Sequence, residues 1–177
     1  MKKINIVLFE PEIPGNTANI IRTCVGTNAV LHLIKPYGFD FNLADKVFKR
    51  GSTNYFDSLK YFEYENFEEF CKKNPYTKNN YFLITRYGEK IYTKMDIKKV
   101  EKEAFIIFGK ESLGIPKKIL QEFQKNTYRL PASKNVRSLN LSNCVMTITY
   151  EALRQLDFEG LDLTEPHKIN HLKIEEN

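Results

Sequence analysis

Three polar segments of the 177-residue chain combine residue types that could bind a phosphate, a ribose or a flat ligand. The first, residues 11–22, begins Pro-Glu-Ile-Pro-Gly and carries Asn16, Asn19 and Arg22 at a spacing of three. If Asn16 caps a helix, these side chains form one drifting polar stripe on its first turns. A helix start with free N–H groups and a nearby guanidinium suits a phosphate or a ribose. A cap followed by a solvated helix face explains the same residues equally well.

The second segment, residues 109–116, is rich in glycine and directly follows the most apolar stretch of the chain. Its spacing G-x-x-x-x-G is that of a phosphate loop, but Ile115 and Pro116 stand where such a loop needs Lys and Ser or Thr. A nucleoside triphosphatase is therefore disfavoured, and the absence of G-x-G-x-x-G disfavours a standard dinucleotide site. A loop whose backbone approaches a flat, weakly charged ligand stays open, as does a simple strand-to-helix turn.

The third segment, residues 130–143, ends in a run of polar residues at the start of an otherwise hydrophobic helix. Asn140, Ser142 and Asn143 are poor helix-interior residues because they compete for backbone hydrogen bonds. Their position beside Leu139 and Leu141 indicates a polar task in a buried place. The alternative is an over-decorated helix cap.

The elements that must position these segments alternate between strand and helix patterns, which predicts an α/β fold with a mostly parallel sheet flanked by helices. In such a sheet, ligands bind outside the carboxyl ends of the strands, where these segments lie. We expect a single domain over residues 1–158 and a polar tail over 159–177. The expected strands are 4–9, 30–34, 56–61, 81–85, 104–108 and 128–130, and the expected helices are 16–27, 43–50, 67–73, 116–123 and 139–156.

Composition narrows the class of protein. The net charge of +5 and the isoelectric point of about 9.0 permit a polyanionic partner without establishing one. Cys24, Cys71 and Cys144 are odd in number and widely spaced, which suggests neither a disulfide framework nor a zinc site. We expect Cys24 and Cys144 to be inert core residues. No apolar run is long enough to span a bilayer and no secretory leader is evident, so we expect a cytoplasmic protein without membrane association.

Taken in order, residues 11–22, 108–116 and 136–143 resemble the three motifs of the SPOUT superfamily of RNA 2′-O-methyltransferases. The likeness extends from residue 4 to about residue 158. The short chain, without an added RNA-binding domain, is similar to the branch that methylates the wobble ribose of certain tRNAs. Two departures are Gly15, where close relatives often have Pro or Gln, and the run 132–134. The resemblance implies a deep C-terminal trefoil knot, S-adenosylmethionine as methyl donor, no metal, a homodimer, and the anticodon region of tRNA as substrate.

The resemblance also assigns roles to residues. Arg22 is expected at the reacting ribose hydroxyl, with Asn16, Asn143 and Tyr150 beside it. Because an arginine stays protonated, Arg22 suits stabilisation of a developing alkoxide better than the role of a simple base. The residues expected to bind the cofactor are Ile84, Thr85, Gly109, Glu111, Ile115, Leu130, Ser138 and Leu139. The basic residues expected to hold RNA phosphates are Lys46, Lys49, Arg50, Lys134 and Arg137.

The last predicted helix has two apolar lines, although one line is enough to cover a sheet. The second line therefore predicts a two-fold dimer built on this helix and the first one, or else packing under loops of the same chain. Such a dimer would bring the Asn16–Arg22 stripe near the partner's cofactor loops. The first line is Leu141, Val145, Ile148, Ala152 and Leu156, and the second is Leu139, Met146, Tyr150 and Leu153.

Two other functions stay open from sequence. One is a 2′-O-methyltransferase for another tRNA or rRNA position. The other is an RNA-binding or assembly protein without turnover. The residues that argue against it are the intact Arg22, Gly109, Glu111, Ser138 and Asn143.

Overall fold

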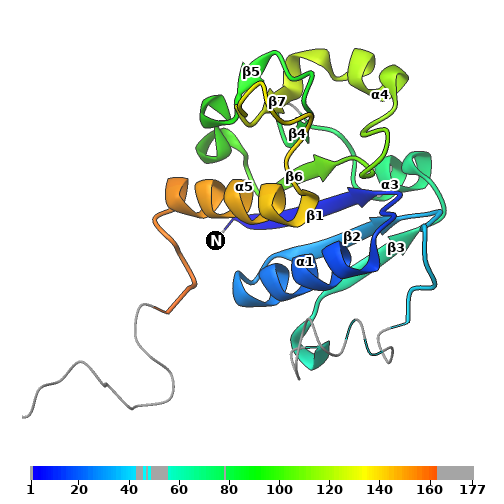
Figure 1. Ribbon diagram of the computed structural model, residues 1–177. Coiled ribbons are helices and arrows are strands. Elements are labelled where there is room, and N and C mark those ends of the chain that lie inside the picture. Colours follow the sequence, from blue (N-terminus) through cyan, green and yellow to red (C-terminus); the bar gives the residue numbers. More distant parts are fainter. Residues whose placement is uncertain (1, 43–45, 47, 49–55, 78, 163–177) are drawn as a thin grey trace, which may run out of the picture.

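The computed structural model describes residues 2–42, 46, 48, 56–77 and 79–162, which form a central sheet with helices on both faces (Figure 1). The sheet has the strand order β3-β2-β1-β6-β4-β7-β5, and every pair of neighbouring strands in it is parallel. The predicted α/β fold with a parallel sheet is confirmed. The strands are β1 (Lys3–Phe9), β2 (Val30–Ile34), β3 (Tyr61–Tyr64), β4 (Tyr81–Ile84), β5 (Lys90–Ile91), β6 (Glu103–Phe108) and β7 (Thr127–Arg129).

Helices cover both faces of the sheet because its strands are apolar on both sides. Along β1, Ile6 and Leu8 join the cluster under α1 and α5, whereas Val7 and Phe9 join the cluster under α3 and α4. None of the described helices is long and apolar enough to cross a membrane. The helices are α1 (Pro14–Gly26), α3 (Phe67–Lys73), α4 (Lys117–Glu122) and α5 (Leu141–Gln155), with short 3₁₀ turns at Phe56–Ser58, Tyr92–Lys94, Ile97–Lys99 and Gln124–Asn126.

The predicted elements need three corrections. The expected strand over 56–61 is wrong: the chain makes a 3₁₀ turn there, and β3 begins only at Tyr61, where pairing with Leu31 of β2 starts. The two-residue strand β5 was not predicted. Asn16 does not cap α1, because the helix already begins at Pro14, a residue well suited to the first helical position. Most of the expected helix 43–50 lies outside the described residues.

His32 and Cys24 are buried core residues. The His32 ring lies between the Tyr64 hydroxyl, 2.8 Å from Nδ1, and Oδ1 of Asn5, 3.0 Å from Nε2. Burial lowers the pKa of His32 to about 4 and raises the pKa of the Cys24 thiol to about 12. Both groups are thus held uncharged near neutral pH, and Cys24 is the inert core residue that the sequence predicted. Cys144 is only half-buried.

The parallel sheet brings four loops to one edge. Strands β1, β4, β6 and β7 all end there, because neighbouring strands of the sheet run in the same direction. The chain that follows these strands is residues 10–13, 85–89, 109–116 and 130–140. The three polar segments singled out from sequence therefore meet at this carboxyl edge.

Candidate active site

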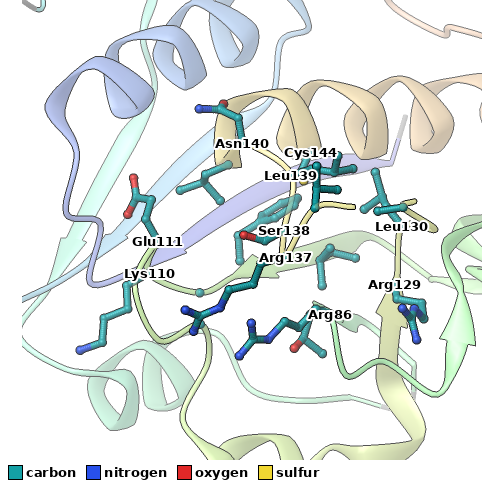
Figure 2. A pocket seen from close by; sticks show the side chains of 18 of the residues that line it. Arg86, Lys110, Glu111, Arg129, Leu130, Arg137, Ser138, Leu139, Asn140 and Cys144 are labelled. Atoms are coloured by element: carbon teal, nitrogen blue, oxygen red, sulfur yellow. The ribbon is translucent and has the colours of Figure 1, made fainter. Parts of the chain in front are cut away.

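A cavity of about 670 Å³ opens between the loops at the carboxyl edge (Figure 2). Most residues expected to bind a cofactor line it. The exception is Ile115, whose side chain is 4% exposed and packs into the core on the α3 and α4 side with Ile107 and Phe123. The expected residues that line the cavity are Ile84, Thr85, Gly109, Glu111, Leu130, Ser138 and Leu139.

One wall of this cavity is glycine backbone. A Cβ atom on Gly109 would lie 2.2 Å from the carbonyl carbon of Gly114, so no other residue fits at this turn. The Gly114 amide donates to the Lys110 carbonyl at 2.9 Å, which closes the loop after β6 on itself. Gly109 is therefore needed to close the loop after β6, whereas Gly114, where a Cβ atom would meet nothing within 4 Å, leaves bare backbone in the lining of the cavity.

Asn16 joins the three polar segments by hydrogen bonds. Its Nδ2 donates to Oε1 of Glu111 at 2.9 Å, and its Oδ1 accepts from Nδ2 of Asn140 at 2.9 Å. The other carboxylate oxygen of Glu111 accepts from the backbone amide of Glu12 at 2.9 Å. Asn16 is only 7% exposed, whereas Asn19 and Arg22 are exposed. The predicted stripe is therefore divided: Asn16 faces the interior loops and the other two face outward.

Asn140 serves two purposes at the start of α5. Its Oδ1 caps the helix by accepting from the Asn143 amide at 3.3 Å and also accepts from the Ser142 hydroxyl at 2.7 Å. Its Nδ2 makes the bond to Asn16. The helix-cap interpretation of this polar run is thus confirmed for Asn140. The buried place that the sequence indicated holds for Ser142 alone, because Asn140 and Asn143 are exposed.

Glu12 of the first segment and Glu10, which precedes that segment, also reach the glycine loop. Glu12 accepts from the Ser112 amide and hydroxyl, both at 2.7 Å, and the Ser112 hydroxyl bond lowers the pKa of this carboxyl. Glu10 pairs with Lys110, with 2.7 Å between Oε2 and Nζ. The first two segments are therefore fixed to each other along the rim of the cavity.

A second cavity, of about 580 Å³, lies between α1 and α5. Arg22, Asn143 and Tyr150 line it, so three of the four expected catalytic residues come together, and Asn16 stands apart from them. We call this second cavity the α1/α5 groove. It shares no lining residue with the first cavity.

The two apolar lines of α5 have different fates. Val145, Ile148 and Ala152 of the first line are buried against the sheet, as predicted. Of the second line, Leu153 is buried, whereas Met146 and Tyr150 are each 45% exposed. Leu139 is also exposed, at the first cavity. An apolar face thus remains open beside Arg22 in the single chain.

Comparison with known proteins places the whole arrangement in a family. The model of the SpoU rRNA methylase family matches residues 3–150. The chain belongs to this family. A provisionally named tRNA (cytidine(34)-2′-O)-methyltransferase of Listeria monocytogenes serotype 4b (strain F2365) is 44% identical over 163 residues, which are 92% of this chain and 94% of the relative.

Two solved structures are similar to this SpoU-family chain in both sequence and fold. One, from Bacillus anthracis and provisionally described as an RNA methyltransferase, is 42% identical with a TM-score of 0.82, covering 92% of this chain and 99% of the other. The second, described as giving insight into the 2-OH methylation of C/U34 on tRNA, is 31% identical with a TM-score of 0.76. It covers 88% of this chain and 97% of the other.

The basic residues expected to hold RNA are only partly brought together in this SpoU-family chain. Lys134 and Arg137 line the first cavity, whereas Lys46 is exposed and is not among the residues that line it. Lys49 and Arg50 lie outside the described residues. Two cations that the sequence analysis missed, Arg86 and Arg129, also line the cavity. Their positions at the carboxyl ends of β4 and β7 were the signal that could have found them.

Proposed function

We propose that this SpoU-family chain transfers a methyl group from S-adenosylmethionine to the ribose 2′-oxygen of nucleotide 34, a cytidine or uridine, in tRNA. The observation that carries the proposal is the 44% identity, over nearly the full length of both chains, to a protein named for that reaction. The structure described for methylation of C/U34 on tRNA supports it. Because tRNA is the substrate, we expect the protein to act in the cytoplasm.

The first cavity suits the proposed methyl donor. Its volume of about 670 Å³ lies within the range usual for ligand pockets. The bare backbone at Gly114 allows a flat ring to approach closely, and Ile84, Leu130 and Leu139 supply apolar contacts. When bound, S-adenosylmethionine would supply a methyl group on a sulfonium, which is already an activated leaving group. We therefore propose that the reaction uses no metal.

The α1/α5 groove offers what the ribose needs during transfer. The 2′-hydroxyl would lose its proton to water as its oxygen bonds to the methyl carbon, while the sulfur–methyl bond of the donor breaks and leaves S-adenosylhomocysteine. Negative charge develops on the oxygen to the extent that the proton leaves before the new bond has formed. A protonated guanidinium at Arg22 would stabilise that charge. The amide of Asn143 and the hydroxyl of Tyr150, in the same groove, would hold the ribose in place by hydrogen bonds.

We propose that a homodimer completes the site. Within one chain, the cofactor cavity and the Arg22 groove are separate, so the donor and the stabilising residue would not meet. A two-fold pairing on α1 and α5 would cover Met146 and Tyr150 and present the groove of one subunit to the cavity of the other. Sedimentation at low micromolar concentration tests this, because an active monomer of 20.8 kDa contradicts it.

We also propose that the C-terminal part of the chain is knotted, as its family resemblance implies. After β7, residues 130–140 cross the carboxyl edge before α5 returns to pack beside α1 and β1. Pulling the two ends apart with optical tweezers tests the knot. A knotted chain stops short of its contour length of about 3.3–3.6 Å per residue, whereas an unknotted one reaches it.

The proposed reaction is tested by mapping ribose methylation in tRNA from a strain that lacks the gene, and by labelling with purified protein in chelator. We expect the methyl group at position 34 to disappear in the strain and to be restored in vitro. Labelling only of rRNA, or of another tRNA position, would favour the alternative methyltransferase. RNA binding without any methyl transfer would favour the non-catalytic alternative.

A further inference from the structure

Four cations line the first cavity without an acidic partner. Arg86, Arg129, Lys134 and Arg137 are all exposed, and in the described part of the chain none of them forms an ion pair. Glu111 is the acidic residue among the lining residues, and both of its carboxylate oxygens already accept hydrogen bonds. Figure 2 shows Arg86 and Arg137 extending along the same side of the cavity, with Arg129 set apart from them. The residues that line the cavity therefore carry a net positive charge.

A rigid turn holds Arg86 and an exposed aromatic ring at this cavity. The Thr85 amide donates to the Tyr128 carbonyl at 2.9 Å, and the Gly88 amide closes the turn on the Thr85 carbonyl at 3.0 Å. A Cβ atom on Gly88 would lie 2.3 Å from the carbonyl carbon of Tyr128, so the turn sits directly against β7. Between these anchors, Tyr87 is 64% exposed.

The ring of Tyr87 is prepared for stacking. The Arg86 guanidinium carbon lies 4.6 Å from the centroid of the Tyr87 ring, and the guanidinium also donates to the Tyr87 hydroxyl. Proteins that bind single-stranded RNA stack its bases on exposed aromatic rings, and nearby cations neutralise the phosphates of the RNA backbone.

The charge of the proposed cofactor decides what these cations serve. S-adenosylmethionine carries one net positive charge at neutral pH, from a sulfonium, an ammonium and a single carboxylate. One carboxylate engages one arginine bidentately, which leaves the other cations close to a cationic ligand. A cluster of this size fits a polyanion better than it fits the cofactor.

On the basis of the proposed function, we propose that Arg86 and Arg129 bind the RNA phosphates next to the target ribose, together with Lys134 and Arg137. Tyr87 stacks on a neighbouring base. RNA and S-adenosylmethionine consequently bind cooperatively. Without RNA, the cations disfavour the sulfonium. Bound phosphates neutralise them, so RNA strengthens cofactor binding, and by linkage the cofactor strengthens RNA binding equally. S-adenosylhomocysteine, the product without the sulfonium charge, gains less from RNA.

Calorimetry at low salt tests the proposal, with S-adenosylmethionine and S-adenosylhomocysteine as ligands and bulk tRNA present or absent. We expect tRNA to tighten S-adenosylmethionine severalfold more than S-adenosylhomocysteine. In the double variant Arg86→Gln/Arg129→Gln, this coupling should disappear and tRNA should bind about tenfold more weakly. The slope of log tRNA affinity against log salt concentration should fall by about one for each lost phosphate contact. Lys118→Gln removes an exposed cation of α4 that does not line the cavity, and should behave as wild type.

Tyr87 has its own matched pair of variants. Tyr87→Phe keeps the ring and should bind tRNA nearly as wild type, whereas Tyr87→Leu should weaken tRNA binding about tenfold. Equal binding of tRNA by these two variants would remove the stacking role.

Two results would overturn the proposal. Loss of S-adenosylmethionine affinity in the double variant without RNA would mean that the arginines hold the carboxylate of the cofactor. Unchanged tRNA affinity in that variant would mean that they do not hold RNA. The proposed function fails separately. Methylation at a position other than 34, with the effects of these variants as expected, would contradict the proposed substrate but not the RNA-binding role of the four cations.

Discussion

The polar residues of the loops at the carboxyl edge differ in their surroundings from those of the α1/α5 groove. In the loops, Glu111, Asn16 and Asn140 satisfy one another across segments that lie far apart in sequence. In the groove, Arg22 lies in an exposed cavity beside Met146 and Tyr150, which each leave nearly half of their surface open. The difference is that the loops satisfy their own polar groups within one chain, whereas the groove leaves apolar surface uncovered, which is the surface that we propose a second subunit covers.

A charge placed in the groove should have the largest effect. In Met146→Glu, pairing on α1 and α5 would take a carboxylate out of water against an apolar face, and the desolvation cost would exceed what a pair with Arg22 returns. We therefore expect a monomer whose methyl transfer falls below detection. S-adenosylmethionine binding should persist, because Met146 does not line the first cavity. Sedimentation and single-turnover assays measure both properties. Met146→Leu is the matched control, and a Met146→Glu monomer with a wild-type rate would show that the groove needs no partner.

Arg22→Ala tests the chemistry of the groove while leaving its apolar surface in place. Loss of one preorganised stabilising group typically costs about 3 kcal/mol, so we expect methyl transfer to slow by about 100-fold or more. Thermal unfolding and cofactor affinity should stay near wild type. Turnover close to wild type would reduce Arg22 to a residue of the helix surface.

Asn16→Ala tests the hydrogen bonds that join the loops at the carboxyl edge. It would leave Oε1 of Glu111 and Nδ2 of Asn140 without their mutual partner, which we expect to lower the free energy of unfolding by about 1–3 kcal/mol. Cofactor affinity should fall as well, because the three loops are no longer joined. Asn19→Ala, on the exposed side of the same helix, is the control and should stay within about 0.5 kcal/mol of wild type in urea unfolding. Equal losses in both variants would contradict the joining role.

An effect that depends on pH should appear in the buried network around His32, which lines neither cavity. Because burial depresses the pKa of His32 to about 4, the folded state favours the neutral ring. The resulting stability is fully present above the unfolded pKa of about 6.5 and is lost as the pH falls below it. We expect the free energy of unfolding to drop by about 2 kcal/mol more in wild type than in His32→Gln between pH 7 and pH 5. Parallel pH profiles would show that the ring is not held neutral.

Local patterns predicted the elements well because strand and helix periodicity depends on near neighbours. The apolar run of β1 and the start of the polar segments follow from such patterns. The role of Asn16 does not, because its partners, Glu111 and Asn140, lie 95 and 124 residues away. For a related reason, the sequence did not show that the side chain of Ile115 packs into the core and does not line the cavity. Contacts between segments that lie far apart in the sequence, and not residue type alone, decide where these side chains lie.

The position of β1 in the sheet has a consequence for how the protein is made. On one side β1 pairs with β2, which follows soon after it, but on the other side Lys3 pairs with Glu103 and Leu8 with Phe108 of β6. The ribosome adds about 5–20 residues per second, so the first strand emerges many seconds ahead of its second neighbour. During that time one apolar edge stays open to other nascent chains. We expect the N-terminal half of the chain, expressed alone, to aggregate and to engage chaperones that bind exposed strands.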